Sequence, residues 1–395
     1  MDFETAALLH RGTVIPAHPL ALDASRRLDE ERQRGLTRYY LAAGAGGLAV
    51  GVHTTQFEIR EHGLYRPVLE LAAEEIAGRA GLAVVGALGS GAAAAGGVAA
   101  TGSAAAGAEA TDSGAAGGGP ATFASAATAT RTATPSPHPA ATDQPSPTPF
   151  VRIAGVAGPT AQAVAEAETA RNLGYDAVLV SPGGLPNLTP EDLLDRSRAI
   201  GEVLPTIGFY LQEAVGGRYL PRSYWRRLAD QPSTVAVKAA PFDRYRTLEL
   251  VQGVADSDRG HEVALYTGND DNIISDLLTP FHVNGTIRRF VGGLLGHWAV
   301  WTRSAVRILD DAHKAVQGDT EARQRVEALN AMCVDANAAV FDVRNGFAGV
   351  IAGVHEVLRR EGVLDGIWCL DPHETLSPGQ AEELTRVLKT YPGLN

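Results

Sequence analysis

Lys238 is the residue of this sequence whose type and setting most clearly suggest chemistry. It lies within residues 233–243, which read STVAVKAAPFD, and its nearest neighbours are apolar or small. A lysine in an apolar setting loses hydration, so its pKa falls and its neutral amine becomes available. A neutral amine can attack a carbonyl carbon and form a Schiff base. The alternative is a structural lysine that extends from the end of a strand to water.

The other lysines of the chain stand in different surroundings. The sequence has three lysines, and Lys314 and Lys389 lie in DDAHKAVQ and LTRVLKTY, stretches that are typical of a solvated helix face. Arginine supplies nearly all the remaining positive charge. An amine kept at one apolar position favours the reactive interpretation, because groups with perturbed pKa values concentrate at functional sites.

A regular alternation of apolar runs and helix-like stretches must position this lysine. The apolar runs predict eight strands, at 13–19, 47–52, 151–156, 177–182, 206–212, 234–240, 263–268 and 290–296. Helical periodicity lies between several of them, at 28–44, 159–174, 189–204 and 246–257. Such an alternation predicts a parallel (β/α)8 barrel, known as a TIM barrel, and the alternative is a doubly wound open sheet.

The composition divides the chain into three parts. Residues 1–85 and 150–297 carry the predicted barrel. Residues 86–149 are almost wholly Ala, Gly, Ser, Thr and Pro, which predicts a disordered low-complexity insert, because few large apolar side chains are present to offset the entropy of ordering. Residues 298–395 are predicted to form a C-terminal helical region, with helices at 299–317, 320–342, 347–361 and 375–390.

Polar side chains follow the predicted strands where a barrel enzyme builds its active site, at the carboxyl ends. Tyr210 is the candidate to act in catalysis beside Lys238. The candidates for binding the substrate are His53, Thr54, Thr55, Tyr266, Asn269 and Asp270. The two threonines could instead turn the chain after the second strand, and Asp270 could cap the next helix. The spacing of these residues fits no metal-binding motif, so no metal site is expected.

The bulk properties of the chain exclude several classes of partner. A formal net charge of −11 argues against a nucleic-acid backbone as ligand. No apolar run is long enough for a membrane span, and the N-terminus lacks the pattern of a signal peptide. Two cysteines, Cys333 and Cys369, suit a reducing cytoplasm. No Gly-rich dinucleotide motif follows the first strand, so no cofactor is expected.

Four segments resemble the dihydrodipicolinate synthase / N-acetylneuraminate lyase family of class I aldolases. LPTIGFYLQ is similar to the family's LP-x-x-x-YN-x-P, TVAVKAAPFD to its IxGIKE(A/S)xGD and LYTGNDD to its SGDD, and Thr54-Thr55 resembles its GTTGE loop. More narrowly, VIPAHPLALD and GVHTTQFEIRE are similar to an uncharacterised branch described only as synthase-family proteins. The resemblance implies that Lys238 forms a Schiff base with a 2-oxo acid, such as pyruvate or a sugar-derived oxo acid. It also implies lyase or hydro-lyase activity and a homo-oligomer, a tetramer or a dimer.

The sequence departs from the family pattern beside the implied lysine. Gly183 and Gly184 stand where the family has the tyrosines of TPYY, and Ala239 stands where it has the glutamate after the lysine. These departures argue against dihydrodipicolinate synthase activity itself. Another group would then move protons, and the candidates are Tyr210, Tyr266 and His53.

Two further functions remain open at this point. One is a catalytically degenerate barrel that binds a carbonyl metabolite without turnover. The other is metal-dependent lyase or hydrolase chemistry that uses His53 and Asp270.

Overall fold

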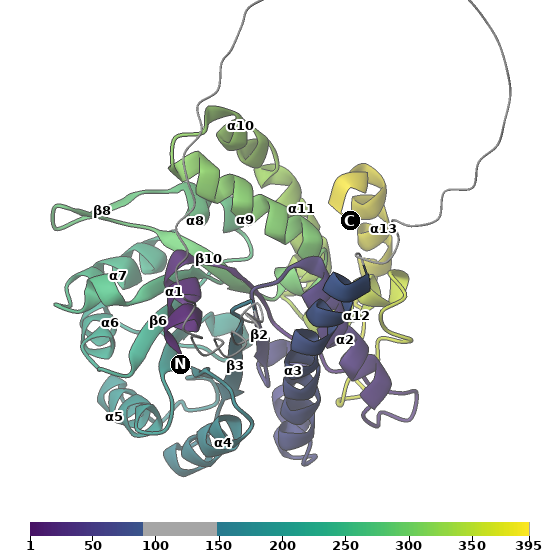
Figure 1. Cartoon of the computed structure of the whole chain (residues 1–395), viewed down its shortest axis with the longest axis horizontal. Helices are drawn as coiled ribbons and strands as arrows, with labels where there is room; N and C mark the ends of the chain where they lie inside the picture. The colour runs from purple at the N-terminus through teal and green to yellow at the C-terminus, as the bar shows by residue number, and fades with distance from the viewer. Residues whose placement is uncertain (90–147, 395) are drawn as a thin grey trace, which may run out of the picture. The chain divides into compact units, whose positions relative to one another are not determined.

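The computed structural model describes residues 1–89 and 148–394 (Figure 1). The chain divides into two compact units, residues 1–81 with 148–395, and residues 82–147. Most of the predicted insert, 86–149, lies outside the described residues, so its disorder stays a prediction.

Eight parallel strands form the sheet at the centre of the first unit. They are β1 (Val14–Pro16), β2 (Gly47–Val50), β3 (Val151–Val156), β4 (Ala177–Val180), β5 (Thr206–Leu211), β6 (Thr234–Ala240), β7 (Ala264–Thr267) and β10 (Phe290–Leu295). The strand order is β1-β10-β7-β6-β5-β4-β3-β2, and a parallel bridge between Ala17 and Ala49 joins the two ends. The sheet therefore closes, and the prediction of a (β/α)8 barrel is confirmed over the open sheet.

Helices follow the strands as the barrel requires (Figure 1). They are α2 (Glu30–Ala43), α3 (Tyr65–Gly89), α4 (Thr160–Asn172), α5 (Pro190–Gly201), α6 (Arg222–Ala229), α7 (Arg244–Ala255) and α8 (Ile273–Leu278). The Thr189 side chain caps α5 by accepting the N–H of Asp192 at 3.2 Å, and Gly174 ends α4 with φ +77°. Threonine at the start and glycine at the end are residue types typical of these helix termini.

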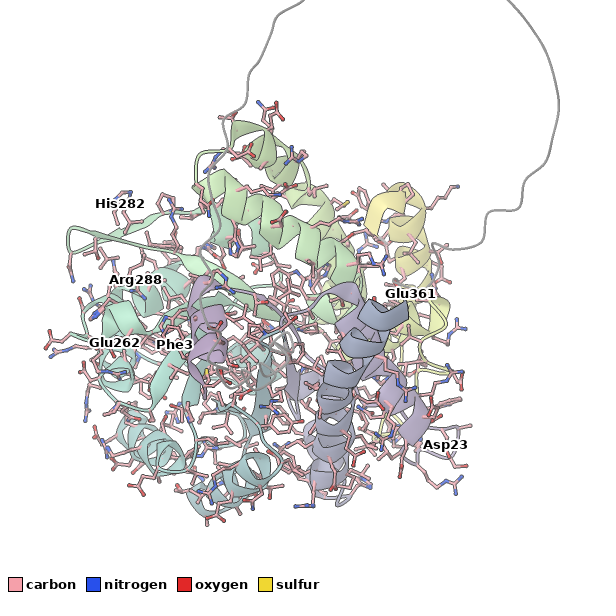
Figure 2. The ribbon with its side chains drawn as sticks, viewed as in Figure 1. Phe3, Asp23, Glu262, His282, Arg288 and Glu361 are labelled. Atoms are coloured by element: carbon pink, nitrogen blue, oxygen red, sulfur yellow. The ribbon has the colours of Figure 1, made fainter. Side chains whose placement is uncertain are left out.

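Two elements of the barrel were not expected from the sequence. Helix α1 (Phe3–Arg11) precedes β1, and its Leu9 packs among the inward-facing side chains of the strands. An antiparallel hairpin, β8 (Phe281–Val283) and β9 (Thr286–Arg288), stands between α8 and β10. Figure 2 labels His282 and Arg288, which mark this hairpin where it projects from the barrel. A hairpin of two three-residue strands is too short to give a recognisable alternation.

The last part of the chain is helical, as predicted. It contains α9 (Thr302–Val316), α10 (Thr320–Ala328), α11 (Asn330–Val340), α12 (Val350–Arg360) and α13 (Gln380–Thr390). The predicted single helix at 320–342 is wrong, because the chain breaks near Leu329 into α10 and α11. Val326 and Cys333 pack in the same hydrophobic cluster on either side of the break, so the apolar pattern continues through it.

Side chains of the strands alternate between the inside and the outside of the barrel. On β6, Ala236 and Ala240 belong to the inner cluster, whereas Val237 and Ala239 pack outward against the helices. Lys238 has the inward register of Ala236 and Ala240. The Lys238 side chain is thus directed into the barrel.

Candidate functional site

A pocket opens at the carboxyl ends of the strands, and Lys238 lies in its wall. About 640 Å³ of space free of protein atoms lies between its walls and in the open solvent at its mouth. Its wall is made by Ala17, Val52, His53, Thr54, Leu179, Phe209, Leu211, Gln212, Val215, Lys238, Ala240, Phe242, Gly268, Asp270, Gly296, Phe341, Phe347 and Val350. This end of the barrel is where (β/α)8 enzymes place their chemistry.

The amine of Lys238 is buried and has no fixed polar partner in the part of the chain that the structure describes. Its residue is 9 % exposed, and Nζ lies 4.3 Å from the centre of the Phe209 ring on the neighbouring strand. Within residues 1–89 and 148–394, Nζ makes no hydrogen bond and no ion pair. Burial lowers the pKa of Lys238 to about 8, and the negative charge of Asp270 partly opposes that shift. A group in this state can supply a neutral amine close to physiological pH.

Asp270 is the acidic group of the pocket wall. It follows β7, is 5 % exposed, and its Oδ1 accepts the backbone N–H of His297 at 2.9 Å. Burial raises the pKa of Asp270 to about 7, while the N–H of His297 and the charge of Lys238 favour its ionised form. Lys238 and Asp270 interact, so they titrate as a pair. The pocket therefore contains both a weakly basic amine and a weakly acidic carboxyl.

His53 and Thr54 also lie in the pocket wall, on a short 3-10 helix, His53–Thr55, that follows β2. Burial lowers the pKa of His53 to about 4, and Lys238 adds to the shift, so the imidazole is neutral at pH 7. Thr55 has a structural position instead. Its Oγ1 accepts the backbone N–H of Gly51 at 2.9 Å and donates to the carbonyl of His18 at 2.6 Å. Of the predicted pair, Thr54 thus lines the pocket, whereas Thr55 stabilises the turn after β2.

The structure does not bring the other predicted polar residues to the pocket. The Tyr210 ring points outward and stacks on Trp225 at 5.1 Å, because its neighbour Phe209 takes the inward register. Tyr266 points inward, but its hydroxyl donates to the carbonyl of Leu9 at 2.8 Å, away from the pocket. These positions do not support the predicted catalytic role of Tyr210 or the predicted substrate contact of Tyr266.

Asn269 does not line the pocket, but its side chain forms hydrogen bonds that stabilise the chain around it. Its Oδ1 accepts the N–H of Phe242 at 3.1 Å, and its Nδ2 donates to Thr247 at 3.1 Å and to Asp276 at 2.9 Å. The predicted substrate contact of Asn269 is not supported, because these bonds satisfy its amide within the protein. The residue fixes the loop after β6 against the start of α8.

Much of the pocket wall is made of residues that carry no signal in the sequence. Gln212 follows β5, and Phe242 belongs to the loop after β6. Phe341 and Phe347 come from the chain between α11 and α12, and Val350 is the first residue of α12. No sequence signal joins that segment to Lys238, since the contact exists only after the C-terminal helices have packed on the barrel.

The two glycines at the family's tyrosine positions line a different pocket. Gly183 and Gly184 lie in a second, more polar hollow with Ser181, Arg60 and Glu166. A side chain at Gly184 would meet open space, and its φ of +73° is one that glycine adopts readily. Neither position lines the pocket around Lys238.

The part of the chain that the structure describes contains no candidate metal cluster and no candidate membrane span. No group of three His, Cys, Asp or Glu side chains is arranged to hold an ion there. No helix among the same residues has the length and hydropathy that crossing a bilayer requires.

This chain is similar to known proteins at the level of the fold. No family model matches the chain, and no curated protein matches it in sequence. The solved dihydrodipicolinate synthase of Oceanobacillus iheyensis is 15% identical with a TM-score of 0.67, covering 98% of this chain and 99% of that one.

Two further solved structures agree with that likeness. The chloride-inhibited dihydrodipicolinate synthase of Acinetobacter baumannii, complexed with pyruvate, is 18% identical with a TM-score of 0.66, and covers 96% of this chain and 98% of its own. The N-acetylneuraminate lyase of Fusobacterium nucleatum is 15% identical with a TM-score of 0.62, and the match covers 97% of this chain and 99% of that one. The fold implied by the sequence motifs is therefore shown: this chain has the barrel architecture of the dihydrodipicolinate synthases and N-acetylneuraminate lyase.

Proposed function

We propose that this protein is a Schiff-base-forming lyase of the class I aldolase type that acts on a 2-oxo acid through Lys238. The observation that carries the proposal is the position of this amine at the carboxyl end of a barrel strand, where it is buried, faces inward and has no hydrogen-bond or ion-pair partner among the described residues. The sequence motifs of strands β5 to β7 and the fold of the solved neighbours support it. One of those neighbours was solved with pyruvate, a 2-oxo acid.

In the proposed reaction, the Nζ lone pair attacks the ketone carbon, and the carbonyl π electrons move to oxygen, which takes a proton. Loss of water then leaves an iminium ion joined to Lys238. The hydroxyl on the fourth carbon gives its proton to the carboxylate of Asp270, and its oxygen forms the carbonyl of the departing aldehyde. The iminium accepts the electron pair of the bond between the third and fourth carbons as that bond breaks. The resulting enamine takes a proton, and water releases the 2-oxo acid and restores the amine.

Asp270 is the group we assign to proton transfer in this sequence. Its carboxyl shares the pocket with Lys238 and has a pKa raised to about 7, so it can both give and take a proton near neutrality. His53 and Thr54 lie in the same wall and are assigned to contacts with the substrate's oxygens. This assignment moves the proton-transfer role away from Tyr210, whose ring faces the helices.

The test is reductive trapping. The protein is incubated with pyruvate and sodium borohydride, and the modified peptide is mapped by mass spectrometry. We expect a stable adduct on Lys238 that is lost in Lys238→Arg and kept in Lys314→Arg, because Lys314 is exposed and pairs with Asp310 on α9. If folded protein yields no adduct with pyruvate or other 2-oxo acids, Schiff-base chemistry is excluded. The barrel that binds a carbonyl metabolite without turnover would then be the better interpretation.

Two further parts of the proposal concern the setting of the enzyme. We place it in a reducing cytoplasm, since Cys333 and Cys369 are both buried free thiols. We also propose a homo-oligomer, a dimer or a tetramer, from the family resemblance alone. Light scattering of the purified full-length chain would measure its mass in solution, and a monomer at working concentration would contradict this part.

A further inference from the structure

We infer that the part of the substrate which does not react is an aromatic ring or a similarly bulky apolar group, and not the hydroxylated chain of a sugar acid. This inference rests on the proposed function for the position of the reacting carbonyl at Lys238. It names the class of 2-oxo acid that the pocket accepts.

The composition of the pocket wall is the first observation. Eleven of its side chains are apolar, namely Ala17, Val52, Leu179, Phe209, Leu211, Val215, Ala240, Phe242, Phe341, Phe347 and Val350. Four of them are phenylalanines, which offer ring faces and edges to another ring. A wall of this kind gains free energy by covering apolar surface of a ligand.

The polar groups of the wall are too few for a sugar chain. Lys238 and Asp270 are engaged in the chemistry, which leaves His53, Thr54 and Gln212 as side-chain partners for hydroxyl groups. A 3-deoxy sugar acid would bring several hydroxyls, and each one buried without a partner disfavours binding. The described wall residues thus select against the sugar-derived oxo acids.

Backbone geometry fixes two of the rings in place. Phe242 and Phe347 have φ of 52° and 70°, in the left-handed region that non-glycine residues seldom adopt. Their rings meet edge to face with centres 6.0 Å apart. Such positions persist only where the surroundings enforce them, and they cluster at ligand clamps.

Hydrogen bonds supply that enforcement. The N–H of Phe242 donates to the side chain of Asn269 at 3.1 Å, and the N–H of Phe347 donates to the carbonyl of Asp342 at 3.0 Å. Gly296 contributes by leaving room, because a side chain there would come within 2.7 Å of the Phe341 ring. The aromatic side of the pocket is therefore preformed.

Binding of ligands that cannot form a Schiff base tests the inference. We compare 4-phenylbutanoate with gluconate by calorimetry on the full-length protein, since both are monocarboxylates without a ketone. We expect 4-phenylbutanoate to bind at least ten-fold more tightly. Phe347→Asn should weaken its binding at least five-fold, because asparagine accepts the left-handed backbone but removes the ring. The control is Val343→Ala, which alters an exposed residue just before the same loop and should leave binding unchanged.

A second variant guards against misfolding of the first. Phe341→Leu keeps an apolar side chain but removes a ring, and we expect it to weaken 4-phenylbutanoate binding by a similar factor. Equal or tighter binding of gluconate would overturn the inference, as would wild-type affinity for 4-phenylbutanoate in both phenylalanine variants. If either of these results is obtained while pyruvate still forms an adduct on Lys238, the inference about the apolar group is refuted and the proposed lyase function is kept. The expected binding without any trapping would instead uphold the apolar site and refute the lyase.

Discussion

The pH dependence of imine formation is the sharpest consequence of the burial of Lys238. Burial lowers the pKa of this amine from 10.5 to about 8. At pH 7 the neutral fraction is then about 9 %, against about 0.03 % for an ordinary lysine, a gain of about 300-fold in reactive amine. The same shift means that charging the buried amine costs about 3 kcal/mol more than charging it in water.

The rate of adduct formation with pyruvate should therefore rise between pH 6 and pH 8 and level off above about pH 8. Single-turnover trapping with cyanoborohydride, quenched at intervals and quantified on the Lys238 peptide, measures this rate. Adducts on the peptides of Lys314 and Lys389, if they form at all, should keep rising toward pH 10 and provide an internal control. A midpoint near 10.5 for Lys238 would show that its setting is not desolvating, and the reasoning from burial would fail.

The sign of the corresponding stability effect follows from the same shift. A depressed folded-state pKa means that the unfolded chain binds more protons between about pH 8 and 10.5. The contribution of Lys238 to stability is thus fully present above pH 10.5 and lost as pH falls through about 8. Lys238→Met should therefore raise the melting temperature more at pH 7 than at pH 10 if the isosteric side chain fits the wall.

The remaining predictions concern the neighbours of the amine. Asp270→Asn should lower the plateau rate of lyase turnover by about 100-fold or more, the usual range for general acid–base groups, and move the trapping midpoint to lower pH; an unchanged turnover rate would remove Asp270 from proton transfer. Gly268→Ala should slow trapping at least ten-fold, since the added carbon would lie 2.4 Å from Cε of Lys238; normal trapping kinetics would contradict this. Tyr210→Phe should leave kcat and KM within two-fold of wild type, and a larger loss would return this residue to the mechanism. Asn269→Ala should lower the free energy of unfolding by about 2 kcal/mol in urea titrations, because three buried hydrogen bonds are lost; a change near zero would show that water replaces them.

Much of the fold was readable from the sequence because a closed parallel sheet buries every strand on both faces. Each strand of the barrel then appears as a short continuous apolar run, such as TVAVKAA, between amphipathic helices. The same property hides which side chains face inward. Tyr210 and Phe209 are equally compatible with a buried strand, and only the register of β5 against β6 turns Phe209 toward Lys238.

Lys238 itself stood out in the sequence because a single amine in an apolar strand is conspicuous in any fold. The sequence also places Asp270 and His53 at strand ends, and parallel strands bring their carboxyl ends to one side of a barrel. What surrounds these groups was decided by tertiary structure alone. Phe341 and Phe347 lie more than 100 residues from Lys238 along the chain and reach the pocket only when the C-terminal helices pack on the barrel. Local patterns report which groups can react, whereas contacts between distant segments decide the shape of the space in which they do so.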